Sequence, residues 1–251
     1  MSLLGRILSR THESPRRPPA DDERDVVCLA FSRKHGGRCL AGLSLNDGRW
    51  VRPISSTVDG TLTPKHYLLD DRSEPRILDL IRVPLERARP EPHQAENWVA
   101  AAKPWRLISR PAGHEAWELI SKATETEALI FGYAGDRIAY KRLLEHPVAA
   151  SLALIAPVDL RLISTEGHAG SPQARLRFWH GGSRYNLVLT DPAWELEIAG
   201  RPPGEYAPRE LGLDPDRTRL TISLGEPTQY DGNCYKLVAA IFEAPLAGRL
   251  V

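Results

Sequence analysis

Cationic and aromatic side chains gather in one short stretch, SRKHGGRCLAGLSLNDGRWVRPIS, at residues 32–55. An arginine fork binds phosphate oxygens, and a tryptophan ring stacks on an unpaired base with about 1–3 kcal/mol per base. Adjacent strands lie about 4.8 Å apart, so a hairpin here would bring these groups to one face. The stretch therefore predicts a surface that binds nucleic acid, single strands in preference to duplex, through Arg33, Lys34, Arg38, Arg49, Trp50 and Arg52.

A second set of the same residue types surrounds WHGGSR in the other half of the chain. It consists of Arg177, Trp179, Arg184 and Tyr185, with Tyr235 and Lys236 nearer the C-terminus. Two such sets in one chain strengthen the nucleic-acid hypothesis. The alternative is structural. The arginines of the first set would then pair with Asp47, Asp59 or acidic residues of the other half, and the aromatic rings would be half-buried core.

The other chemistry-bearing residues do not predict a reaction centre. His93 and Asn97 lie in PHQAENW without further ligands at suitable spacing, whereas zinc needs three or four. We expect structural hydrogen bonds there, with Trp98 in the core. Cys39 follows His35 by four residues, but no third group orients a nucleophile–base pair. We therefore expect no catalytic residue, no metal ligand and no cofactor.

The composition limits the partners and the compartment. A net charge of +1 over 251 residues means that nucleic-acid binding must come from a local patch. Cys28, Cys39 and Cys234 lack CxxC spacing, which argues against a disulfide framework and predicts a reduced, cytoplasmic environment. Cys28 and Cys234 are expected to be buried small hydrophobes. No segment approaches the roughly 20 apolar residues of a membrane-spanning helix, so no membrane partner is expected.

Strand patterns stand on both sides of a helical pattern. VVCLAFS, RCLAGLSL and RWVRPIS are separated by turn sequences and predict an antiparallel meander, while RILDLIRVPLERARP is a candidate strand pair. Apolar residues at helical spacing over 114–146 predict two helices. SLALIAPVDLRLIST then predicts one long bent strand, and a hairpin about Gly181 and two further strands follow. Without strand–helix alternation, a parallel doubly wound sheet is not expected.

This order predicts a mainly β fold with minor α content. It consists of two OB-like antiparallel barrels joined by a helical segment, with a β-sandwich as the alternative. The expected divisions are a flexible N-terminal arm at 1–24, a first barrel at 25–112, a helical bridge at 113–148 and a second barrel at 149–251.

Five fragments carry a family resemblance: VCLAFSRKHGGRCLAG, WVRPIS, HQAENW, LTISLGEP and CYKLVAAIF. In combination they resemble the bacterial dual OB-containing domain family, from about Val26 to Glu243. The resemblance implies two OB-type barrels and a prokaryotic conflict or defence context. It implies no catalytic residues.

These observations favour a non-catalytic module that binds single-stranded DNA or RNA. One alternative is a scaffold for a protein partner, which the N-terminal arm could also contact. The other is a small-nucleotide sensor or enzyme with a pocket between the barrels. A continuous positive groove would favour nucleic acid, an exposed apolar patch a protein, and a deep pocket with buried polar groups a small molecule.

Overall fold

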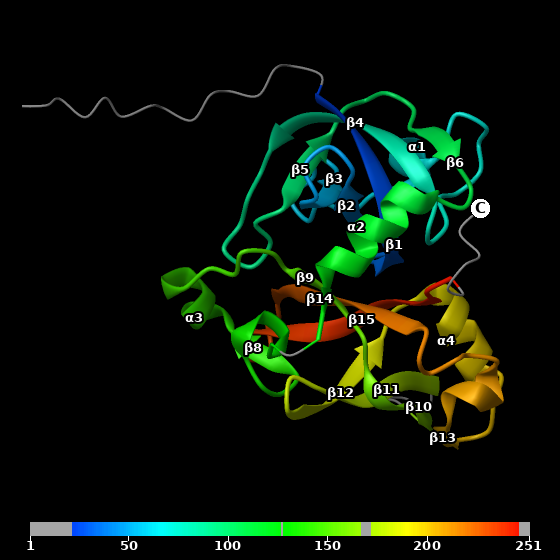
Figure 1. The fold of residues 1–251 in the computed structure, drawn as a ribbon. Coiled ribbons are helices and arrows are strands. Elements are labelled where there is room, and N and C mark those ends of the chain that lie inside the picture. Colours follow the sequence, from blue (N-terminus) through cyan, green and yellow to red (C-terminus); the bar gives the residue numbers. More distant parts are fainter. Residues whose placement is uncertain (1–21, 127, 167–171, 246–251) are drawn as a thin grey trace, which may run out of the picture.

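The computed structural model describes residues 22–126, 128–166 and 172–245, and the predicted arm at 1–24 lies almost wholly outside them. Two β-barrels are stacked on one another, the first made by β1–β6 and the second by β9–β15 (Figure 1). Strand β1 begins at Asp22, so residues 22–24 belong to the first barrel. The expected mainly β fold with two OB-like barrels is confirmed.

The first barrel is a closed ring in the order β1-β2-β3-β5-β4, with β4 pairing back to β1 and β6 added outside β4. Neighbours are antiparallel except β3 and β5, which run parallel. Its elements are β1 (Asp22–Lys34), β2 (Gly37–Ser44), β3 (Trp50–Ile54), α1 (Pro64–Tyr67), β4 (Leu80–Ala88), β5 (Asn97–Ala100) and β6 (Arg106–Ser109). The stretch expected to form a strand pair is the single strand β4.

The second barrel repeats this order as β10-β11-β12-β15-β14, again with one parallel contact, between β12 and β15. Strand β9 pairs with β14, and only Ala156 and Pro157 separate it from β10. The stretch expected to form one bent strand is therefore two strands, of which β9 pairs with β14 and β10 pairs with β11. The elements are β9 (Leu152–Ile155), β10 (Val158–Glu166), β11 (Pro172–His180), β12 (Ser183–Leu189), α4 (Pro192–Ala199), β13 (Gly204–Tyr206), a 3-10 turn (Pro208–Leu211), β14 (Thr218–Pro227) and β15 (Asn233–Glu243).

The segment between the barrels is only partly helical. It contains α2 (His114–Ala123), β7 (Thr124–Glu125), a 3-10 turn (Ile130–Gly132), β8 (Arg137–Ala139) and α3 (Tyr140–Glu145). Helix α2 lies at the junction of the barrels, where Ala116 and Ile120 are buried (Figure 1). Ile138, expected in the second helix, instead pairs with Cys234 as part of β8. The second helix is therefore shorter than the apolar spacing suggests.

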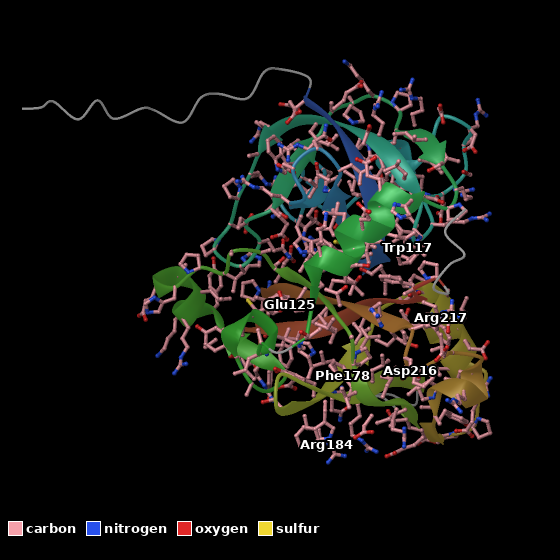
Figure 2. All side chains as sticks on the ribbon, viewed as in Figure 1. Trp117, Glu125, Phe178, Arg184, Asp216 and Arg217 are labelled. Carbon is pink, nitrogen blue, oxygen red and sulfur yellow. The ribbon has the colours of Figure 1, made fainter. Side chains whose placement is uncertain are left out.

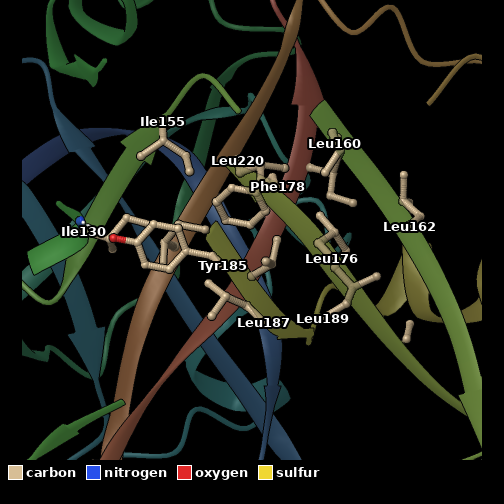
Figure 3. Packing of buried hydrophobic residues seen from close by; sticks show 14 of the residues in the cluster. Ile130, Ile155, Leu160, Leu162, Leu176, Phe178, Tyr185, Leu187, Leu189 and Leu220 are labelled. Atoms are coloured by element: carbon tan, nitrogen blue, oxygen red, sulfur yellow. Dashed lines mark hydrogen bonds between the residues drawn. The ribbon is translucent and has the colours of Figure 1, made fainter. Parts of the chain in front are cut away.

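Each barrel has its own core. Val26, Cys28 and Val51 point into the first. The second is filled by a cluster that includes Phe178 and Tyr185, whose rings stack at 5.6 Å (Figure 3).

A third apolar layer joins the barrels. It buries the outer side chains of β1 and β2, such as Leu29 and Leu43, against Leu154 of β9 and Ala240 of β15. Because both faces of these strands are buried, their sequences are continuous apolar runs rather than alternating ones. The outer face of β1–β3 is therefore covered by the second barrel.

Gly42 permits the close approach of β2 to β1 beside a β-bulge between Cys28 and Ala30. A Cβ at this position would collide with the carbonyl oxygen of Val27 and lie 2.6 Å from Val26 Cγ1. We expect Gly42→Ala to lower the free energy of unfolding by about 3 kcal/mol, the cost of an overpacked site. Urea denaturation measures the effect. Gly204→Ala, whose Cβ would make only ordinary contacts, is the control and should be neutral or slightly stabilising. Equal effects of the two substitutions would contradict this role of Gly42.

Candidate functional site

Arg52 lies at the junction of the barrels and is only 3% exposed. Its Nε donates to Glu96 Oε1 at 2.9 Å, and its Nη2 donates to the hydroxyls of Ser151 at 2.7 Å and Ser223 at 3.3 Å. Its Nη1 lies 3.0 Å from Cys39 Sγ. Ser151 and Ser223 belong to the second barrel. Arg52 therefore joins the barrels and, contrary to the sequence-based expectation, is not part of an exposed basic surface.

Glu96 completes this buried network, since its Oε2 accepts from the backbone N–H of Ser151 at 2.9 Å. Burial alone would raise the pKa of Glu96, but the Arg52 guanidinium and the Ser151 hydrogen bonds hold it below its ordinary value. Burial likewise opposes the charge of Arg52, yet Cys39 and Glu96 together raise its pKa. Both groups stay ionised. Sequence reasoning missed Glu96 because nothing in AENW distinguishes a buried glutamate from an exposed one.

Other members of the first set also hold the barrels together. Arg33 pairs with Glu195 of α4 at 3.5 Å, and Lys34 Nζ donates to Glu226 of β14 at 2.8 Å. Both acidic partners come from the other half of the chain, as the structural alternative supposes. Trp50 is half-buried against the same apolar layer.

Two cations of the first set make no cross-barrel pair. Arg38 lies 3.5 Å from Glu74, within the first barrel. Arg49 is exposed, and its side chain has no ion pair among the described residues. The structure therefore disperses the predicted basic patch.

Two members of the second set are buried and correct the sequence-based expectation. Tyr185 is 1% exposed, and its hydroxyl accepts from the backbone N–H of Ile130 at 3.2 Å (Figure 3). Lys236 Nζ donates to the carbonyl oxygens of Tyr133 and Gly135 and lies 5.0 Å from the centre of the Tyr185 ring. Alternation along the strands points both side chains inward, so neither can contact a nucleic acid.

The outer face of β10–β12 carries cationic and aromatic side chains, namely Arg161, Arg175, Arg177, Trp179 and Arg184. Trp179 is 45% exposed and stands directly opposite Arg184, an exposed residue without a side-chain partner among the described residues. Directly opposed side chains have Cβ atoms about 5 Å apart. Figure 2 shows Arg184 on the side of the second barrel that is remote from the first. We call these five residues the β10–β12 face.

The remaining cations of this face are held in place. Arg175 Nη2 donates to the backbone oxygen of Asn186 at 2.6 Å, and its Nε donates to the Asn186 side chain at 3.1 Å. Arg177 pairs with Glu205 of β13. The Arg175 contacts are to neutral groups, so its charge stays available to an anion.

A cleft of about 780 Å³ opens between the barrels. Its lining includes Lys34, Cys39, Arg52, Glu226, Tyr235 and Leu237. Tyr235, the last member of the second set, donates its hydroxyl to Asp231 at 2.7 Å and lies in this cleft rather than on the β10–β12 face. Glu226 was not anticipated either, although it neutralises Lys34 and lies 3.3 Å from His35.

The sequence-derived candidates for chemistry are dispersed or buried. Among the described residues, no three His, Cys, Asp or Glu side chains could together hold a metal ion. His35 is exposed and faces Glu226, whereas Cys39 contacts Arg52. Burial raises the pKa of the Cys234 thiol to about 11 and that of Cys28 further still, so neither supplies a thiolate near neutral pH. Within the described ranges, no helix is long and apolar enough to span a membrane.

Lys236 makes the stability depend on pH in a defined direction. Burial lowers its pKa to about 8 from an ordinary 10.5. Between these values the unfolded chain binds more protons, so the free energy of unfolding rises with pH. We expect the wild type to gain roughly 3 kcal/mol relative to Lys236→Met from pH 7.5 to 10.5, at 1.36 kcal/mol per pKa unit. Denaturant titrations across this range measure the difference, and parallel profiles would disprove the assignment.

Glu96 makes the free energy of unfolding rise with pH as well, but in a more acidic range. Its pKa is lower in the folded protein, so its contribution is fully present above its ordinary pKa of 4.5 and is lost as the pH falls through the folded value. Glu96→Gln leaves Arg52 buried without its anion and should lower the free energy of unfolding at pH 7 by about 3–5 kcal/mol. The exposed pair of Glu86 with Arg87 supplies the control, because Glu86→Gln should change it by less than about 1 kcal/mol. A mild effect of Glu96→Gln would refute the bridging role.

One of three comparisons with known proteins is informative about the fold. No curated protein matches the sequence. A solved structure titled "Molecular basis for abrogation of activation of pro-inflammatory cytokines" covers 94% of this chain and 98% of its own at 8% identity. Its TM-score of 0.31 is too low to carry information about fold or function. The sequence model of a protein family described as the dual OB-containing domain matches residues 24–241. Two OB barrels are the architecture of a binding module. With this match and both barrels in the OB strand order, the chain belongs to the dual OB-containing domain family.

Proposed function

We propose that the protein binds single-stranded nucleic acid through the β10–β12 face. The observation that carries this proposal is the exposed Trp179 opposite the unpaired Arg184. A large aromatic side chain exposed to solvent stacks on a base, and the adjacent guanidinium binds the following phosphate. Arg175 and Arg177 lie on the same strand as Trp179 at alternate positions, which extends the cationic surface along β11.

The position of these residues in the fold supports the same ligand. OB folds bind oligonucleotides and oligosaccharides on the face of their second and third strands, which correspond here to β11 and β12. The equivalent face of the first barrel is covered by β9 and β15. The second barrel therefore offers the OB ligand face among the described residues, and the first serves as its support.

Single strands fit this face better than duplex. Trp179 lies on a sheet surface, where it can stack only on a base that is free of its neighbours. Duplex bases are stacked within the helix, and proteins read them by inserting an element into a groove. The β10–β12 face is instead the surface of three adjacent strands of the sheet.

The test is fluorescence anisotropy with a labelled oligonucleotide of about 20 nucleotides at several salt concentrations. Trp179→Ala should weaken binding about tenfold, since stacking is worth about 1–3 kcal/mol per base and 1.4 kcal/mol is a factor of ten. For this variant, the slope of the logarithm of affinity against the logarithm of salt concentration should equal that of the wild type. Arg184→Ala should reduce that slope by about 0.7, the value for one phosphate contact on a single strand.

Arg87→Ala, an exposed arginine of β4, is the matched control and should bind like the wild type. Melting curves confirm that each variant is folded. The absence of binding to DNA and RNA at micromolar protein and low salt would refute the proposal. The protein-scaffold alternative, with Trp179 and the 60%-exposed Val158 as its contact, would then be favoured.

A further inference from the structure

A second, smaller pocket of about 300 Å³ adjoins the cleft between the barrels. The two share Lys34, Asp59, Gln94, Glu226 and Pro227 in their linings. The smaller pocket is further lined by His93 and Asn97 of the HQAENW stretch, by Arg89, and by Tyr140 at the start of α3. It therefore lies apart from the β10–β12 face and is built from both barrels and the connecting segment.

Buried polar atoms of this pocket lack partners. His93 and Asn97 are 3% and 2% exposed, yet neither His93 Nδ1 nor Asn97 Oδ1 makes a hydrogen bond among the described residues. Glu91 Oε2 faces His93 Nδ1 at 3.7 Å, beyond hydrogen-bond distance. Arg89 Nε is in the same condition. The orientation of Asn97 is fixed, because its Nδ2 donates to Gln94 Oε1 at 3.2 Å. Asn97 Oδ1 is thus a hydrogen-bond acceptor without a donor among the described residues.

Such atoms are rare in folded proteins, because an unpaired buried polar group forfeits its hydrogen bonds to water. Three in one pocket indicate a polar occupant. Burial lowers the pKa of His93, and the surrounding Glu91, Glu226, Glu96 and Arg52 act on it in opposing directions. His93 is accordingly a neutral imidazole, able to donate or accept one hydrogen bond at Nδ1.

The lining selects the chemistry of the occupant. Lys34 and Arg89 are outnumbered by Asp59, Glu91 and Glu226, so the pocket has no excess of positive charge to hold a phosphate. Tyr140 is half-buried and contacts the His93 ring edge-on at 5.6 Å, which offers an aromatic surface for stacking. An acceptor, a donor and an aromatic ring together match a neutral planar heterocycle that carries both donors and acceptors.

We propose that this pocket binds the base of an uncharged nucleoside, with the sugar directed into the larger cleft. Asn97 Oδ1 accepts from an exocyclic amino or ring N–H group, and Arg89 or His93 donates to a ring nitrogen or carbonyl oxygen. Both volumes lie in the range of about 300–1,000 Å³ typical of small-molecule sites. The proposal is independent of nucleic-acid binding by the second barrel.

Isothermal titration calorimetry and thermal shift with the full chain test it, using adenosine, guanosine, cytidine and uridine, each also as its 5′-monophosphate. We expect at least one nucleoside to bind and to raise the melting temperature, and its monophosphate to bind no more tightly. Asn97→Ala and His93→Ala should each weaken binding about tenfold. His114→Ala, an exposed histidine of α2, should have no effect.

Tyr140 is half-buried in the connecting segment, so Tyr140→Leu serves as a second variant if the substitutions of fully buried residues unfold the protein. It should also weaken nucleoside binding. Trp179→Ala should leave nucleoside affinity unchanged, so failure of this proposal is distinguishable from failure of the nucleic-acid proposal. No binding of any nucleoside at about 1 mM would overturn the assignment, and a gain in stability for Asn97→Leu would then indicate that the pocket holds only water. Tighter binding of a monophosphate would also overturn the assignment.

Discussion

The buried ion pair of Arg52 with Glu96 fixes how the two barrels sit against each other. Removing two charges from water is costly, and the cost is recovered only when every donor and acceptor is satisfied. Here the partners come from both barrels, because Ser151 and Ser223 complete the shell of the pair. An apolar interface alone would tolerate sliding between the barrels. The polar network adds a directional requirement that selects one arrangement.

That arrangement determines which surfaces are available to ligands. Apposition of β1–β3 with β9, β14 and β15 covers one OB face and leaves the other, on β10–β12, at the far side of the molecule. The same apposition creates the cleft and the smaller pocket beside it. Two barrels of one topology thus expose different faces, and the difference arises from packing rather than from strand order.

The fold could be predicted from the sequence, whereas the site could be predicted only in part. Continuous apolar runs, turn sequences and alternation mark the strands because these patterns are local. Whether an arginine is buried or exposed depends on residues far away in the sequence. Arg52 pairs with a buried glutamate 44 positions away, whereas Arg184 is exposed to solvent. Tyr185 and Lys236 were misassigned for a related reason. Their position relative to the alternation of the strands placed them inward, although their types suggested a surface.

The covered face of the first barrel has a consequence for biosynthesis. Strand β6 ends at Ser109, whereas β15, which supplies much of the covering layer, ends at Glu243. At about 5–20 residues per second, translation of this interval takes roughly 7–27 s, during which Val27, Leu29 and Leu43 lack their partners from the second barrel, Leu154, Ala240 and Phe242. A ribosome that stalls in this interval would carry a first barrel with an exposed apolar surface. Apolar surface that is exposed for seconds during synthesis is the kind that aggregates and that chaperones bind.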